Sequence, residues 1–182
     1  MIDPFVLLTP ILLLAVIALL RFVGCNQVFG LEPTVPREKV EERSVDFLLK
    51  PEQVLMSGDA LNGMYLGLNF GVNQWRWEAT PGYPGDIFFF DSTSPSRSFT
   101  IVNGGTLKSM LVFTKTDGQI TLTDDQGESK TQRITVAAYV QSVITGWTQF
   151  ATSVTVEFTP DPGGSPADLG IAKITYDIIV SS

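Results

Sequence analysis

Two tryptophans close together in the chain have the type and spacing of a ligand-stacking pair. Trp75 and Trp77 stand two apart in NQWRWE, so on a strand both rings point to the same face. An exposed pair could stack on a sugar ring, since aromatic faces suit apolar CH groups. In a small β domain such pairs more often lie in the core, and the sequence leaves both interpretations open. Trp147, in TGWT, is expected to be a core residue.

A turn rich in acidic residues is the second candidate site. Asp124, Asp125 and Glu128 lie together in TDDQGE, and oxygen ligands at this density could hold calcium. The same composition is common in a solvated hairpin loop, where Asp bonds its own backbone. The sequence favours the loop. No cofactor is therefore expected, with Ca²⁺ at this turn as the alternative.

A loop aromatic residue is the third candidate. Tyr83 lies in the sequence PGYPGD, residues 81–86. Loops held by a rigid β framework are a common place for binding residues. Tyr83 is therefore the loop side chain that we expect to contact a ligand.

The composition argues against an enzyme. The 182-residue chain has no His and a single Cys, Cys25. Without imidazole there is no Ser-His or Cys-His nucleophile pair and no His ligand for zinc or haem. The formal net charge of -7 disfavours a nucleic-acid partner, because phosphate binding needs clustered Lys and Arg. We expect a non-catalytic protein, although hydrolysis by carboxylates alone remains conceivable.

An apolar run precedes all the candidate residues. Residues 4–20 read PFVLLTPILLLAVIALL, without a charge, and a helix extended to Val23 spans roughly 28 Å, close to the thickness of a bilayer's hydrocarbon layer. A water-soluble helix would carry a polar stripe, and this segment has none. We predict a single transmembrane helix in residues 1–25, in contact with membrane lipid.

Other interpretations of this N-terminal segment remain open. A cleaved secretory signal fits poorly, because Asp3 makes the start acidic and Arg21 interrupts the cleavage region. A lipoprotein signal is closer, since VGC at residues 23–25 resembles the end of a lipobox, with Cys25 as the lipidated residue, but Phe22 stands where Leu is usual. A buried hairpin helix is the third alternative. Arg21 alone would place the C-terminal domain in the cytoplasm.

A linker is predicted over residues 26–52, rich in Pro, Glu and Arg. Its stretch PREKVEERSV has Pro36 at the start, which favours a short exposed helix. Phe47, Leu48 and Leu49 are apolar enough to dock on the domain that comes after the linker.

Residues 53–182 read as a mainly β domain. Ile120 and Leu122 alternate with polar residues in the period of two that marks a half-buried antiparallel strand. Asp117 and Gly118 predict a two-residue hairpin turn. The predicted strands cover residues 64–70, 86–90, 97–102, 107–114, 119–123, 129–136, 139–145, 152–158 and 172–180. Many short strands between turn signals predict a jelly-roll-type antiparallel β-sandwich.

The order of these strands and turns carries a family resemblance. The segments at residues 61–78, 96–134, 145–158 and 168–176 resemble a bacterial galactose-binding-domain-like sandwich, a superfamily with many carbohydrate-binding modules. The family often ends in DLGIDDITY, whereas this chain has Ala172 and Lys173 in place of the two acids. That substitution counts against any cation site there.

The resemblance implies export, so the domain is expected in the periplasm or at the cell surface, although Arg21 alone favours the cytoplasm. Two functional classes are consistent with these features. The first is a single-pass, membrane-anchored binding or interaction module, with carbohydrate as one ligand class. The alternative is a structural or accessory subunit, whose helix packs in a larger membrane complex or filament while the sandwich packs on partner subunits.

Overall fold

The computed structural model describes residues 38–47, 58–80, 83–89 and 94–181. The chain divides into two units, residues 1–38 with 181–182 and residues 39–180, and the second contains nearly all of the described residues. The predicted transmembrane helix and Cys25 lie outside the described residues, as do Leu48 and Leu49. In the part that is described, no helix is both long and apolar enough for a membrane span.

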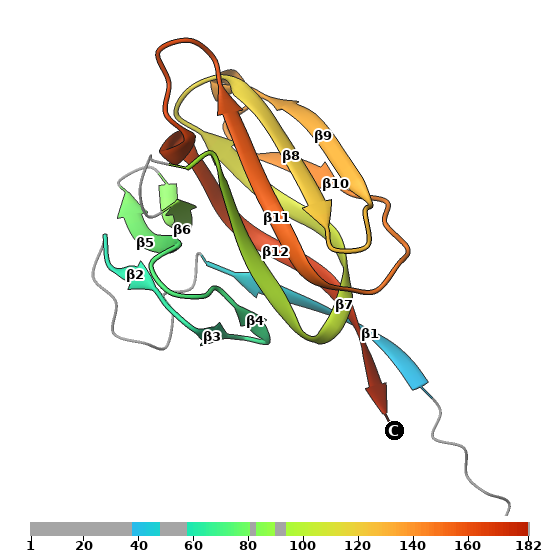
Figure 1. The fold of residues 1–182 in the computed structure, drawn as a ribbon. Helices are drawn as coiled ribbons and strands as arrows, with labels where there is room; N and C mark the ends of the chain where they lie inside the picture. Colours follow the sequence, from blue (N-terminus) through green and yellow to red (C-terminus); the bar gives the residue numbers. More distant parts are fainter. Residues whose placement is uncertain (1–37, 48–57, 81–82, 90–93, 182) are drawn as a thin grey trace, which may run out of the picture. The chain divides into compact units, whose positions relative to one another are not determined.

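The described chain is mainly β, as predicted. The strands are β1 (Glu38–Asp46), β2 (Ala60–Leu61), β3 (Met64–Tyr65), β4 (Leu68–Asn69), β5 (Trp75–Thr80), β6 (Tyr83–Phe89), β7 (Ser96–Thr114), β8 (Gly118–Asp124), β9 (Ser129–Ile134), β10 (Gln141–Ile144), β11 (Ala151–Pro160) and β12 (Leu169–Ser181) (Figure 1). Two short 3-10 helices, η1 (Val136–Ala138) and η2 (Pro166–Asp168), interrupt them. The described strands join into one hydrogen-bonded network, with the order β2-β5-β6-β12-β7-β11-β8-β9 along its main path.

Strand β7 connects the two parts of this network. Its first half pairs with β4 and β11, with Thr100 opposite both Asn69 and Ser153. Its second half pairs with β12 and β10, with Met110 opposite both Ile174 and Val143. Figure 1 shows the strand bending sharply between these halves. All of these pairings are antiparallel.

The bend in β7 lies where the sequence predicted the end of one strand and the start of another. Asn103 and Gly104 have positive φ angles of 66° and 79°, a conformation that Asn and Gly tolerate best. At Gly105 a Cβ atom would lie 2.4 Å from the carbonyl oxygen of Asp177 in β12. Only glycine therefore allows β12 to approach the chain at this point.

Three local predictions were wrong. The stretch after Pro36 is not a helix: β1 pairs with β12. Asp117 and Gly118 do not form a hairpin turn, because β8 pairs with β9 and β11 rather than with β7. Residues 64–70 are not one strand: positive φ values at Leu66 and Gly67 make a tight turn between β3 and β4.

The core is a continuous cluster of buried apolar side chains with an aromatic centre. Phe70 contacts Phe47, Trp75 and Phe99, with ring centroids 5.7, 6.2 and 6.0 Å apart. Phe47 is thus docked on the β domain, as predicted. The alternation predicted for β8 is also confirmed, since Ile120 and Leu122 are fully buried. Packing from several strands against one aromatic group ties the sheet parts together.

We predict that Gly105→Ala lowers the free energy of unfolding by about 3 kcal/mol, because the new methyl group meets a backbone carbonyl that no rotamer change can move. Gly127→Ala is the control: Gly127 has a φ of 93°, and no atom of the described residues would lie within 4 Å of an added Cβ, so only backbone strain of about 1 kcal/mol is expected. Urea unfolding of the full-length protein in detergent, followed by tryptophan fluorescence, measures both. Equal losses in the two variants would contradict the close approach at Gly105.

Candidate functional site

The tryptophan pair lies in the core. Trp75 is fully buried and Trp77 is 6 % exposed. Trp75 Nε1 donates a hydrogen bond to the Ser98 carbonyl oxygen at 3.1 Å, and Trp77 Nε1 donates to the Phe47 carbonyl oxygen at 3.3 Å. Buried rings with their polar atoms satisfied hold β5 against β7 and against the residue that follows β1. The core interpretation is confirmed, and the interpretation of the pair as an exposed sugar platform was wrong.

The other two aromatic candidates have different outcomes. Trp147 is buried, as predicted. Tyr83 begins β6 rather than lying in a long loop, and its backbone is opposite Thr80 of β5. The side chain of Tyr83 lies outside what the structure describes, so its role as a ligand contact stays a prediction.

The acidic turn is a β8–β9 hairpin stabilised by its own carboxylates. Asp124 Oδ1 accepts hydrogen bonds from the backbone N–H groups of Gln126 and Glu128, at 3.0 and 2.7 Å. Glu128 Oε2 accepts from the backbone N–H groups of Thr148 and Gln149, both at 3.2 Å. These bonds tie the turn to the segment before β11. The hairpin loop and the bonding of Asp124 to its own backbone are therefore confirmed, whereas Asp124 itself is buried, at 6 % exposed, rather than solvated.

The carboxylate of Asp125 binds a different residue from those bound by Asp124 and Glu128. Its carboxylate accepts from the backbone N–H of Thr152, at 3.0 Å to Oδ1, and from the Thr152 hydroxyl. These bonds lower the pKa of Asp125, the hydroxyl contributing most. The carboxylates of this turn thus bind separate backbone groups. In the described ranges, no group of three or more His, Cys, Asp or Glu side chains is arranged to hold a metal ion.

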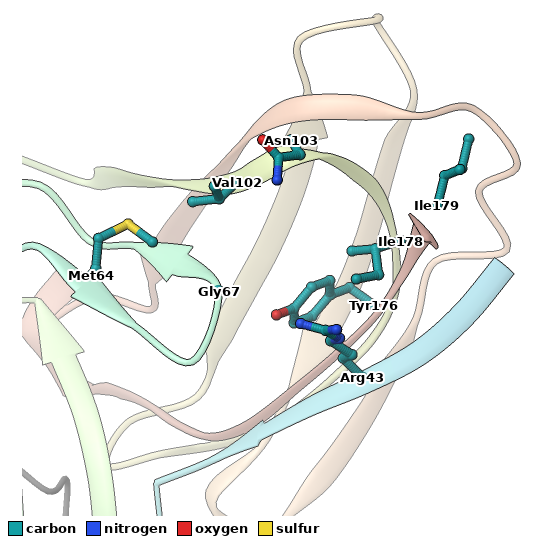
Figure 2. Close-up of a pocket in the computed structure, with 8 residues that line it drawn as sticks. All are labelled: Arg43, Met64, Gly67, Val102, Asn103, Tyr176, Ile178 and Ile179. Atoms are coloured by element: carbon teal, nitrogen blue, oxygen red, sulfur yellow. The ribbon is translucent and has the colours of Figure 1, made fainter. Parts of the chain in front are cut away.

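A pocket of about 170 Å³ opens beside the bend of β7 (Figure 2). We name it the bend pocket. It is lined by Arg43, Met64, Gly67, Val102, Asn103, Tyr176, Ile178 and Ile179. These residues come from β1, from the β3–β4 hairpin, from the bend itself and from the end of β12.

Tyr176 fixes the floor of the bend pocket. Its hydroxyl donates to the carbonyl oxygen of Leu66 at 2.8 Å, and a Cβ on Gly67 would lie 2.7 Å from that hydroxyl. The Val102 N–H donates to the carbonyl oxygen of Gly67 at 3.0 Å, which joins the hairpin to the bend. Burial raises the pKa of Tyr176, and the charge of Arg43 opposes part of that rise. The phenol therefore stays protonated at neutral pH and keeps its donor.

Exposed apolar side chains gather at this pocket. Among the lining residues, the exposed fractions are 51 % for Met64, 37 % for Val102 and 43 % for Ile179, and Leu66 at the hairpin tip is 56 % exposed. Leu66 also has a φ of 47°, a conformation that leucine disfavours. Neither burial nor turn preference explains a leucine there. Strain and exposed apolar surface of this kind are typical of binding sites.

The sequence did not indicate this pocket. Arg43 fell in the predicted linker, and residues 103–104 read as a turn between strands. Tyr176 fits the alternating pattern of an ordinary strand, so the neighbouring sequence does not indicate that its hydroxyl bonds the β3–β4 hairpin. The Asn-Gly-Gly run at residues 103–105 was the available signal, because such a run inside a β pattern also marks a bend.

Comparisons with protein-family models, with curated proteins and with the solved structures give no match.

We predict that Thr152→Val makes the protein less stable than wild type at pH 7, by less than about 1 kcal/mol, because an exposed charged hydrogen bond is screened by water. The lowered pKa of Asp125 means that its stabilisation is present above the ordinary value of 3.8 and is lost as the pH falls through the folded-state pKa. The difference in the free energy of unfolding between variant and wild type should therefore shrink as the pH falls. Urea midpoints measured from pH 7 down to about pH 2.5 test this.

Thr159→Val is the control, since Thr159 is exposed on the same strand and has no carboxylate bonded to its hydroxyl among the described residues. A stability difference in Thr152→Val that is constant across the pH range would show that the hydroxyl acts without the charge of Asp125.

Proposed function

We propose that this protein is a non-catalytic interaction module tethered to a membrane by its N-terminal apolar segment. In this proposal the described strands form a jelly-roll-type sandwich of the galactose-binding-domain-like kind, exported to the periplasm or the cell surface. The split of β7 between two sets of partners supports a two-sheet arrangement. The uncharged run at residues 4–20 supports the tether.

The bend pocket is the observation that carries the interaction role. A small concave site with an apolar rim and few polar groups is the usual form of a binding site. Its exposed lining residues Met64, Val102 and Ile179 do not belong to the buried core cluster, so their apolar character is better explained by contact with another molecule. The sugar-binding version of the proposal is weakened, because the tryptophan pair that would have carried it is buried.

A second group of exposed apolar residues favours the alternative of a structural or accessory subunit. Val136, Tyr139, Val140 and Ile144 are 44, 52, 37 and 64 % exposed. They lie one after another through η1 and β10. Strand β10 pairs with β7, and it has no second partner strand among the described strands. An edge strand with apolar neighbours can pack on another subunit.

The tether is tested by alkaline carbonate extraction of membranes that contain the full-length protein, with intact mass measured on the retained fraction. We expect retention in the membrane pellet and a mass that starts at Met1, because an apolar span of this length partitions into the hydrocarbon layer. Cys25→Ser should be retained equally. Release of the wild type into the supernatant would contradict the tether, and a mass starting at a lipidated Cys25 would replace the helix by a lipid anchor.

The two functional classes are separated by the native mass of the protein extracted in mild detergent. The interaction module predicts a protein that runs near its own mass plus detergent, unchanged in Ile144→Asp. A structural subunit predicts a larger complex that Ile144→Asp disperses, because a charge at that edge would be buried in the interface. Val72→Asp is the control, since Val72 is 71 % exposed and lies outside both groups.

A further inference from the structure

The size of the bend pocket limits what it can hold. Its volume of about 170 Å³ is close to that of an engineered cavity of about 150 Å³ that takes up benzene. Sites for drug-sized ligands run from about 300 Å³ upward. The pocket therefore accepts one ring or one branched alkyl group, either as a small molecule or as the end of a longer one.

The charge of the pocket comes from one side. Among the described residues that line it, Arg43 is the only charged one. The ion pair of Arg43 joins its Nε to Glu41 Oε1 at 3.5 Å, with the Arg43 side chain 47 % exposed. Within the described part of the chain, that contact uses the inner nitrogen and leaves the terminal fork of the guanidinium for another group. A guanidinium fork matches a carboxylate in two parallel hydrogen bonds.

The opposite side of the pocket offers an amide. Figure 2 shows Asn103 and Val102 across the pocket from Arg43, with Tyr176 and Ile178 between them. The left-handed backbone at Asn103, with φ of 66°, places this side chain at the bend. Met64, Val102 and Ile179 supply the apolar wall. The combination is one cation, one amide and an apolar body.

Other ligand classes fit this lining less well. A cation would be repelled by Arg43. A sugar ring would need several hydrogen-bonding partners and an exposed aromatic face, whereas Tyr176 is 1 % exposed and its hydroxyl already bonds Leu66. A phosphate dianion would place its charge against an apolar wall, with only one cation to compensate it.

We infer that the bend pocket binds a small amphipathic carboxylate, whose charged group pairs with Arg43 and whose ring or branched alkyl body lies against Met64, Val102 and Ile179. This assignment rests on the proposed role as an interaction module and names its ligand chemistry. The carboxylate could belong to a free organic acid or to the C-terminus of a peptide that ends in an apolar residue. Both sources present the same group to the same residues.

The test uses phenylacetate and its neutral isostere phenylacetamide, with the full-length protein in detergent and binding followed by ligand-observed NMR. A ligand of this size binds with a dissociation constant on the order of 1 mM. We expect saturable binding of the acid and at least tenfold weaker binding of the amide. An acetylated tripeptide ending in Phe, compared with its C-terminal amide, distinguishes the peptide source from the free acid.

Two variants test the named residues. Arg43→Gln should weaken phenylacetate binding at least tenfold, and Asn103→Gly, which keeps the left-handed backbone accessible, should weaken it two- to fivefold. Arg133→Gln is the matched control, since Arg133 is an exposed arginine paired with Asp161, away from the pocket lining, and should bind as wild type does.

Equal binding of acid and amide, or wild-type affinity in Arg43→Gln, would overturn the assignment of a carboxylate. If none of the four probes bound saturably while the protein stayed in the membrane pellet after carbonate treatment, the carboxylate ligand would be overturned and the tethered module would stand. Release of the protein by carbonate would instead contradict the tethered module. The binding of the four probes would still decide whether the ligand is a carboxylate.

Discussion

The structure depends on one strand that serves two sets of partners. β7 is 19 residues long, and its halves pair with different strands, β4 and β11 before the bend and β12 and β10 after it. A straight strand could not do this. The bend requires positive φ angles at Asn103 and Gly104 and a residue without a side chain at Gly105, where β12 lies closest. Three neighbouring residues thus decide whether the two parts of the network can join.

The candidate site is a consequence of that bend. Between its pairings with these two sets of partners, β7 contributes residues 102 and 103 to the lining of the bend pocket, where the Val102 N–H donates to the carbonyl oxygen of Gly67 in the β3–β4 hairpin. Tyr176 closes the floor by bonding Leu66, so β12 holds the β3–β4 hairpin in position. β1 adds Arg43 to the rim. The pocket therefore combines residues far apart in the sequence, and its shape results from how the strands are joined rather than from any one motif.

Local patterns predicted the strands well and the long-range arrangement poorly. Alternation at Ile120 and Leu122 reports burial on one face, so β8 was predicted correctly. Turn chemistry is ambiguous, because Asp117-Gly118 and Asn103-Gly104 both suit a reversal of the chain. In the structure, Asp117-Gly118 lies at the start of β8 and Asn103-Gly104 lies at the bend of β7. The tryptophan pair was placed on one face by its spacing, but which face is covered depends on Phe70 and Phe99. Arg43 was missed because a charged, Pro-flanked stretch has weak strand preference, and β1 forms through its pairing with β12.

If β7 joins the described domain into one cooperative unit, its two halves must open together. Amide hydrogen exchange of the full-length protein, read on peptides from residues 96–101 and 107–114, measures this. We expect the slowest amides in both halves to exchange with the same free energy of opening, through global unfolding, because neither half can open without breaking the shared core. If residues 96–101 exchanged in a separate, faster opening while residues 107–114 stayed protected, the two parts would be independent and the bend would not be the constraint that joins them.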